Sequence, residues 1–102
     1  MLLNHIYRHP RSLPFRKPVD EVALGIYPAY SNIITHPIDL GTIKSQIDNG
    51  LYCTKDELIA DIQLVWNNAK KFNPIGHAVY ESADFLEKFA HDRIGESYIC
   101  SG

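Results

Sequence analysis

The stretch "TKDELIADIQLVWNNAKKFNP", Thr54 to Pro74, decides the fold expected for this chain. Its apolar residues recur at helical spacing and so share one face of a helix. Thr54 and Glu57 have the spacing of a capping box, which satisfies free N–H groups at a helix start, whereas Pro74 cannot continue a helix. The apolar face consists of Leu58, Ile59, Ile62, Val65, Trp66, Ala69 and Phe72. The segment therefore predicts an amphipathic helix from about Thr54 to Phe72, with Trp66 in the core.

Asn73 stands where this helix ends, and its side-chain amide needs a partner. An asparagine at such a place commonly forms a turn or caps the helix, because its amide bonds nearby backbone groups. The same amide carries donors and an acceptor, so it also suits a ligand. On Asn73 and Pro74 alone a turn or a cap is favoured, and the neighbouring motifs must decide.

Three other segments also have helical periodicity. A short helix near the start ends at Pro10. A second runs from an Asp39 cap to a stop at Asn49-Gly50, and the last fades near Gly95. Their apolar faces are Leu2, Leu3, Ile6 and Tyr7; Leu40, Ile43 and Ile47; and Val79, Ala83, Leu86 and Ala90, with Phe85 and Phe89 beside the last. No strand-like alternation persists, so we expect an all-α protein built as a four-helix bundle.

The segment from Ser12 to His36 has no regular periodicity. Pro14, Pro18 and Pro28 prevent a continuous helix there. The segment is nevertheless rich in large apolar residues, which argues against disorder. Structureless loops of this length are usually functional when they are ordered. We therefore expect an ordered loop that lines a site.

The composition is that of a single globular domain. The chain has 102 residues, 45% of them hydrophobic, which is enough to bury a core. Its net charge is −2 and basic residues are mixed with acidic ones, so direct nucleic-acid binding is not favoured. No apolar run is long enough for a membrane span, and the first residues lack a signal peptide's features.

Metal and disulfide chemistry are not indicated either. Cys53 and Cys100 match no zinc or disulfide pattern, which favours reduced thiols in an intracellular protein. His5 and His9 have the i, i+4 spacing of metal ligands, but no third ligand accompanies them, so we expect a solvated helix face. The sequence therefore predicts no metal, no cofactor and no catalytic residues.

The chain resembles a bromodomain. The motifs that carry the resemblance are "PF", "PVD", "IITHPIDLGTIK", "LIAD" and "NNAKKFNP", in that order. The similarity is strongest over residues 13–94, within a single domain spanning residues 1–102 whose first helix is short and expected to be truncated. "PVD" with "DLGTIK" is most similar to bromodomains of the BET type, and a more divergent bromodomain factor fits as well.

This resemblance implies a left-handed four-helix bundle that binds acetylated lysine at one end. A long ZA-type loop, from about Pro10 to Pro37, and a short BC-type loop, from Asn73 to His77, would form the pocket. By position, Asn73 matches the family's anchoring asparagine, and Tyr30 matches the tyrosine that reaches the ligand carbonyl through a water. The other pocket residues implied are Pro14, Phe15, Val19, Leu24, Phe72 and Val79, together with Ile26 or Tyr27.

Several positions depart from the BET pattern. Leu13 stands where BET proteins have a shelf tryptophan, which implies a weaker grip on residues that flank the acetylated lysine. Ser31 replaces a second tyrosine, and Ala29 replaces an acidic residue. The stretch "LGIYPAY" carries one residue more than usual, so the resemblance leaves open whether Ile26 or Tyr27 lines the pocket.

The chemistry of such a pocket follows from the ligand. Acetylation makes lysine neutral and gives it an amide carbonyl, so the side chain becomes an apolar rod with one polar end. Burying the rod contributes roughly 2–3 kcal/mol and a direct hydrogen bond about 1 kcal/mol. Unmodified lysine would lose several kcal/mol because its ammonium would be desolvated without a partner. Selectivity would therefore come mainly from rejecting the charge.

These observations favour a non-catalytic reader of acetyl-lysine. The expected partners are acetylated histone H3 or H4 tails, other acetylated nuclear proteins, and small molecules that mimic acetyl-lysine. We expect a nuclear module that is monomeric, with no direct contact to nucleic acid or membrane. One alternative is a helix-bundle interaction domain with a non-functional acetyl-lysine pocket. An enzyme is the other, but no nucleophile, phosphate-loop or zinc motif supports it.

Overall fold

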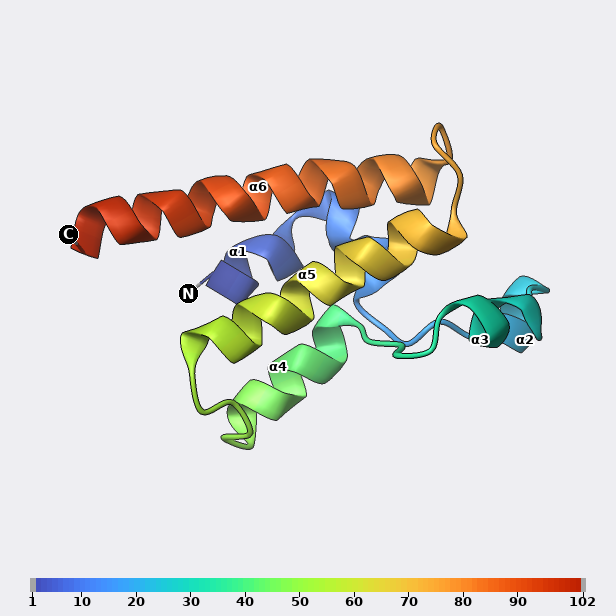
Figure 1. Ribbon diagram of the computed structural model, residues 1–102, viewed down its shortest axis with the longest axis horizontal. Helices are drawn as coiled ribbons and strands as arrows, with labels where there is room; N and C mark the ends of the chain where they lie inside the picture. The colour runs from blue at the N-terminus through green and yellow to red at the C-terminus, as the bar shows by residue number, and fades with distance from the viewer. Residues whose placement is uncertain (1, 102) are drawn as a thin grey trace.

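The computed structural model describes the backbone of residues 2–101 and the side chains of residues 3–20 and 22–92. Within this range the backbone contains helices but no strand, which confirms the predicted all-α class (Figure 1). The helical elements are α1 (Leu2–Arg8), the 3₁₀ helix η1 (Pro10–Phe15), α2 (Glu21–Leu24), α3 (Ala29–Ile33), α4 (Leu40–Asp48), α5 (Lys55–Phe72) and α6 (Ala78–Ser101).

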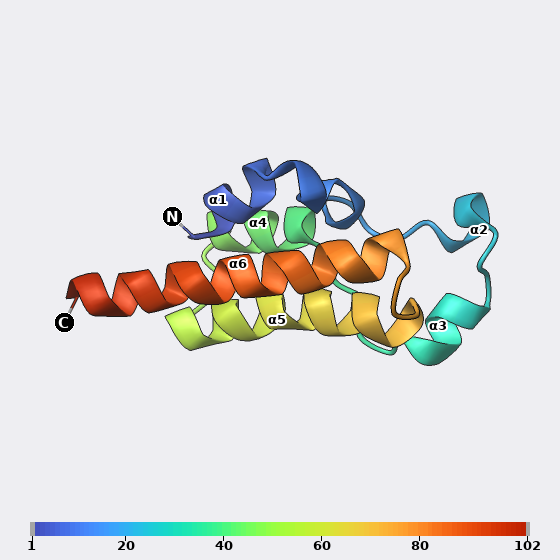
Figure 2. The same cartoon turned by 90° about the horizontal axis from the view of Figure 1, so that it is seen from above.

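The two longest helices, α5 and α6, lie side by side along the length of the molecule (Figure 2). Helix α1 packs against α6 and α4, and α4 packs against α5, so these helices form one bundle. The short helices α2 and α3 lie beyond one end of the bundle, at the end where α5 connects to α6. Both loops that the sequence predicts to form a site are therefore at the same end.

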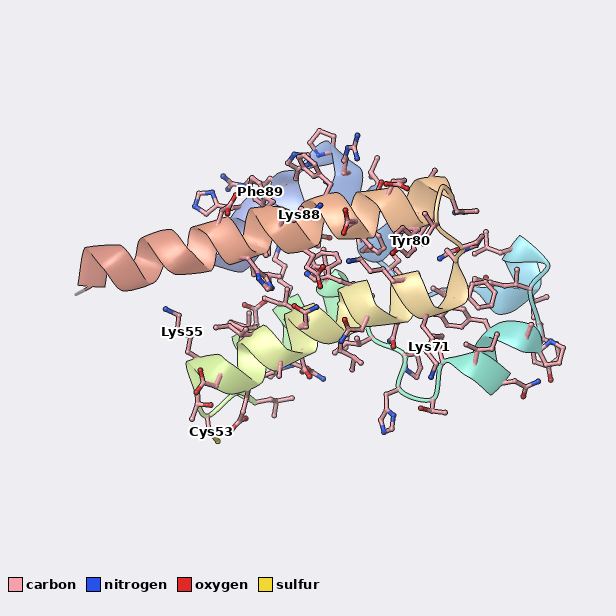
Figure 3. The ribbon with its side chains drawn as sticks, turned by 45° about the horizontal axis from the view of Figure 1, so that its top comes forward. Cys53, Lys55, Lys71, Tyr80, Lys88 and Phe89 are labelled. Atoms are coloured by element: carbon pink, nitrogen blue, oxygen red, sulfur yellow. The ribbon has the colours of Figure 1, made fainter. Side chains whose placement is uncertain are left out.

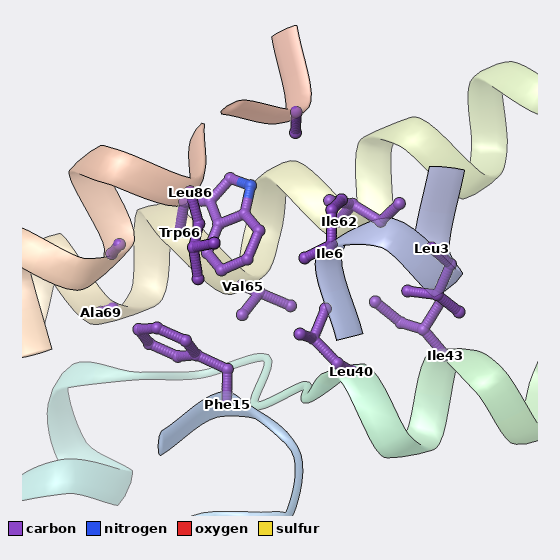
Figure 4. Close-up of a cluster of buried hydrophobic side chains, with 12 residues drawn as sticks. Leu3, Ile6, Phe15, Leu40, Ile43, Ile62, Val65, Trp66, Ala69 and Leu86 are labelled. Carbon is purple, nitrogen blue, oxygen red and sulfur yellow. The ribbon is translucent and has the colours of Figure 1, made fainter. Parts of the chain in front are cut away.

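The core lies between these four helices and η1 (Figure 4). Trp66 is completely buried, as predicted, and the ring of Phe15 meets its indole edge-to-face with 5.3 Å between ring centroids. Such aromatic pairs contribute about 0.5–1.5 kcal/mol beyond the area that they bury. The other buried apolar residues of this cluster are Leu3, Ile6, Leu40, Ile43, Ile62, Val65, Ala69, Ala83, Leu86 and Ala90.

The predicted caps begin the two central helices. The Asp39 carboxylate accepts the Thr42 backbone N–H at 2.9 Å at the start of α4. At the start of α5, the Thr54 hydroxyl accepts the Glu57 backbone N–H at 3.2 Å. Glu57 reaches back to the backbone N–H of Cys53, at 3.4 Å, one residue before the partner of a regular capping box. The local signals in the sequence therefore locate both helix starts.

Two expectations about element bounds were wrong. Helix α6 does not fade near Gly95 but continues to Ser101. One interior glycine costs a helix only about 1 kcal/mol relative to alanine, so it weakens a helix without ending it. The segment Ser12–His36 is also not irregular throughout, because part of η1 and all of α2 and α3 are helical turns within it. Pro28 precedes the first residue of α3, where its missing N–H is tolerated.

A polar network fastens α5 to α6 on the surface. The Lys70 ammonium donates to Asp84 at 3.0 Å and to Glu87 at 2.6 Å, and Lys88 also donates to Asp84. Gln63 donates its amide to Glu87. Burial works against the charged form of Glu87, but the hydrogen bonds from Lys70 and Gln63 outweigh it and hold the pKa of Glu87 below its usual value. The bond to Glu87 is the main cause that raises the pKa of Lys70.

Tyr52 closes the turn between α4 and α5. Its hydroxyl lies 2.6 Å from the Gln46 side-chain oxygen and 2.6 Å from a carboxylate oxygen of Asp61, to which it donates. Burial and this carboxylate raise the pKa of the Tyr52 hydroxyl, because both disfavour the phenolate. Asp61 is half-buried, and its bond with Tyr52 links the α4–α5 turn to α5.

Candidate functional site

A cavity of about 590 Å³ opens between the long loop and the α5–α6 turn. Its volume is within the range of small-molecule sites, and its exposed lining is mostly apolar. Eight of the ten residues that the sequence predicts for the site lie on this cavity: Pro14, Val19, Leu24, Ile26, Tyr30, Phe72, Asn73 and Val79. They come from the part of the chain between η1 and α3 and from the region where α5 ends and α6 begins, so the cavity requires the bundle to be folded.

Asn73 follows the last residue of α5 and both caps the helix and faces the cavity. Its backbone N–H donates to the Ala69 carbonyl at 3.0 Å, and its side-chain amide nitrogen donates to the same carbonyl at 3.0 Å. An amide NH₂ has two N–H groups, so Ala69 uses only one of them. The capping alternative is thus observed, and a donor on the half-buried Asn73 amide is still left for another acceptor.

Tyr30 and Phe72 form the aromatic part of the wall. Tyr30 is buried on α3, and its ring meets the Phe72 ring edge-to-face at 5.0 Å. This contact fixes α3 against the end of α5, next to Asn73. The rings therefore give the cavity a firm side that an apolar ligand chain can touch.

Two predicted residues lie elsewhere. Phe15 is part of the core and lines a smaller cavity of about 50 Å³, which shares Tyr30, Asn73 and Val79 with the larger one. Tyr27 is 67% exposed and is not among the lining residues of the larger cavity. Where the sequence left two alternatives for the extra loop residue, the structure places Ile26 on the cavity wall.

The position of Val79 depends on a cap at the start of α6. The His77 ring nitrogen Nδ1 accepts the backbone N–H of Val79 at 3.1 Å, and the Glu81 carboxylate accepts the backbone N–H of Gly76 at 3.1 Å. These bonds satisfy donors at the start of α6, which otherwise lack partners. His77 also lines the cavity, so this residue both begins α6 and forms part of the rim.

Asn68 is a site-lining residue that the sequence analysis did not identify. It is buried, and its amide nitrogen donates to the His36 backbone carbonyl at 2.9 Å, which ties the end of the long loop to α5. It also lines the smaller cavity. The sequence contained a signal for this position. Asn68 is three residues after Val65 and four residues before Phe72, which places its amide on the apolar face of α5.

The rim carries few charges. Lys17 and Asp20 stand on the long-loop side of the cavity, and the sequence motifs did not single them out as site residues. Asp39 lines the smaller cavity, but its carboxylate is committed to capping α4. The arrangement therefore offers an apolar slot with one amide donor, which suits a slim neutral ligand that carries a carbonyl.

Neither a metal site nor a membrane segment is found where side chains are described. No group of three or more potential ligands gathers among these residues. His5 is exposed as expected, but His9 packs against the rings of Phe85 and Phe89 at 5.0 and 5.3 Å, so the prediction of a solvated face was wrong for His9. The Cys53 thiol is free and exposed. Among the described helices, none combines the length and the apolar character that crossing a membrane requires.

Comparison with known proteins agrees with the resemblance seen in the sequence. The family model described as Bromodomain matches residues 1–84. The transcription factor GTE3, chloroplastic, of Arabidopsis thaliana is 42% identical over 85 residues, which cover 83% of this chain and 18% of that protein. The transcription factor GTE9 of the same plant is 43% identical over 88 residues, which cover 86% of this chain and 13% of that protein.

A histone acetyltransferase is also similar. GCN5 of Debaryomyces hansenii is 32% identical over 96 residues, which cover 94% of this chain and 20% of that protein. This chain therefore spans a fifth or less of the length of these three relatives. The family model, the identities and the helical fold agree with one another, and the chain belongs to the bromodomain family.

Proposed function

We propose that this chain is a reader module that binds acetylated lysine in histone H3 or H4 tails or in other acetylated nuclear proteins. The observation that carries the proposal is the apolar cavity of about 590 Å³ with the Asn73 amide on its wall. Acetyl-lysine has the matching shape, because its apolar chain ends in one neutral amide. The family and the transcription factors among the relatives support a role in chromatin and a nuclear location.

The site discriminates by charge. The second N–H of Asn73 donates to the acetyl carbonyl, and Tyr30 reaches the same carbonyl through a water. The walls contributed by Val19, Phe72 and Val79 remove the lysine chain from water. The carboxylate on the lining is that of Asp20, which is exposed at the long-loop rim and accepts the Ala23 backbone N–H, so an unmodified ammonium between the apolar walls loses several kcal/mol of solvation. Because association entropy offsets much of the gain, a single mark binds with a Kd on the order of 10–1,000 μM.

We propose no catalytic role for the module. The similarity to the acetyltransferase covers 20% of that protein, and the cavity here offers an amide donor and aromatic walls instead of a nucleophile with a neighbouring base. We also propose that the module binds its acetylated partners without a metal or a cofactor.

Titration of matched peptides tests the proposal. Histone H4 peptides with no, one or two acetylated lysines are titrated against the chain by calorimetry, with circular dichroism to verify that it is folded. The expected result is measurable binding of the acetylated peptides and none of the unmodified peptide. A folded chain that binds none of them, or all of them equally, refutes the reader function.

One observation favours a second candidate function. The Asn73 amide is already bonded to the Ala69 carbonyl, which a structural cap alone would explain. In that case the chain is a helix-bundle interaction domain whose pocket does not bind acetyl-lysine. This candidate predicts partner binding that free N-acetyl-lysine amide does not compete away, whereas the reader proposal predicts competition.

A further inference from the structure

We propose that the groove next to the acetyl-lysine cavity binds an anionic side chain, glutamate, aspartate or phosphoserine, located close to the acetylated lysine in the same peptide. This inference rests on the proposed function. The groove has a volume of about 450 Å³ and lies along the α5–α6 turn. It shares Phe72 and Asn73 with the acetyl-lysine cavity, so the two sites are continuous.

The charged residues that line this groove are both lysines, Lys70 and Lys71. The Lys70 ammonium is compensated by Asp84 and Glu87, at 3.0 and 2.6 Å. Lys71 is exposed, and no carboxylate among the described side chains lies within ion-pair distance of it. The groove therefore has one uncompensated positive charge, and a negatively charged group is its complement.

The remaining surface of the groove suits the stem of such a side chain. Ile75 is 82% exposed, which is unusual for a large apolar residue, and Tyr80 is half-buried with its ring 5.8 Å from the Lys70 ammonium. Figure 3 shows Lys71 and Tyr80 toward the same end of the bundle, whereas Lys55 lies at the opposite end of α5. An apolar floor beside an exposed ammonium can contact both the methylene groups and the charged end of a glutamate.

The groove is within reach of residues near the acetylated lysine in the same peptide. An extended chain advances about 3.5 Å per residue, so a residue within about three positions of the acetylated lysine can reach the neighbouring groove. The groove thereby provides selectivity that the acetyl-lysine cavity alone lacks. Acetylated sites with an acidic or phosphorylated neighbour are preferred over sites with only basic neighbours.

A peptide scan tests this inference. Each peptide carries one acetylated lysine in a neutral glycine–serine–alanine scaffold, with glutamate, glutamine, lysine or phosphoserine at one position up to about three residues away. At one position or more, glutamate should bind about two- to fivefold more tightly than glutamine, the gain typical of an exposed ion pair. Phosphoserine should gain more and lysine should lose affinity, and raising the salt from about 0.05 M to about 0.5 M should reduce these differences.

Two charge-reversal variants identify the residue responsible. Lys71→Glu should invert the order, so that lysine-flanked peptides bind more tightly than glutamate-flanked ones. Lys55→Glu makes the same charge change at the other end of α5, and it should leave the order of peptide affinities as it is in the parent. Glutamate is also tolerated there because the first turn of a helix favours negative charge.

The outcomes separate this inference from the reader function. If the glutamine-flanked acetylated peptide binds but no position prefers glutamate over glutamine, the anionic groove is refuted and the reader function stands. If Lys71→Glu prefers glutamate over glutamine as strongly as the parent does, the groove is refuted as the source of that preference. If no acetylated peptide binds to the folded chain, both proposals fail.

Discussion

Replacing Asn73 by alanine removes the polar group on which the proposed recognition depends. The variant loses the direct donor to the acetyl carbonyl, which keeps only the proposed water-mediated bond to Tyr30 in a mostly apolar cavity. Removing the direct hydrogen-bond donor of a buried acceptor costs about 1–3 kcal/mol. Since 1.4 kcal/mol corresponds to a factor of ten, the Kd for an acetylated peptide should rise about 5- to 150-fold.

The same substitution has a smaller effect on the fold. It removes one hydrogen bond, from the Asn73 amide to the Ala69 carbonyl, while the backbone N–H of residue 73 still caps that carbonyl. The loss is about 0.5–1 kcal/mol of unfolding free energy, which lowers the Tm of a domain of this size by about 2–8 °C. Asn49→Ala is the matched control, because Asn49 is the C-cap of α4 and lies at the opposite end of the bundle.

Calorimetric titration and thermal melts of the same samples separate the two effects. Asn73→Asp adds a test of the donor itself, since a carboxylate of the same shape has no N–H to give. Both variants of Asn73 should lose peptide binding at a temperature where they are folded, and Asn49→Ala should keep it. Binding within twofold of the parent for Asn73→Ala would refute the anchoring role that we assign to this amide.

Three further predictions concern the fold around the site. Tyr52→Phe should lower the unfolding free energy by about 1 kcal/mol in urea denaturation, because a carboxylate of α5 loses its donor, and it should leave peptide affinity unchanged. Asn68→Ala should lower the unfolding free energy by about 1–3 kcal/mol and also weaken peptide binding, because the hydrogen bond from the buried Asn68 amide to the His36 carbonyl of the long loop is lost; unchanged binding would show that this link does not position the site. The pKa of Glu87 is lower in the folded chain than its usual value of 4.5. The ionised carboxylate therefore contributes to the unfolding free energy above pH 4.5, and this contribution is lost as the pH falls through the lower folded pKa. Lys70→Met should therefore show a weaker loss of stability than the parent when unfolding is measured between about pH 5 and pH 3, and equal slopes would contradict this assignment.

Much of the bundle could be predicted because its signals are local. The stripe of α5 and the caps at Asp39 and Thr54 involve residues a few positions apart, where helical geometry alone decides which groups meet. The position of Asn73 at the end of α5 was predicted for the same reason, whereas the ligand-anchoring role proposed for it came from the family resemblance. Gly95 misled the prediction, because its effect depends on the stability of the whole of α6.

The parts of the site that could not be predicted depend on contacts distant in sequence. Periodicity cannot choose between Ile26 and Tyr27, because the choice depends on how α2 and α3 sit against the end of α5. The bond from Asn68 to His36 spans 32 positions, and the ion pair from Lys70 to Glu87 spans 17. Such contacts exist only once the elements have packed, so no local pattern specifies them.

The fold and the proposed recognition draw on largely different residues. The apolar core around Trp66 holds the four helices together, whereas the cavity is formed where α5 ends, α6 begins and the long loop returns to α5. The loop is held there by the Asn68 amide and by the contact between Tyr30 and Phe72. Substitutions at the rim can therefore change which peptide binds without unfolding the bundle, and this is why charge reversal at an exposed lysine is a sharper test than truncation of a core residue.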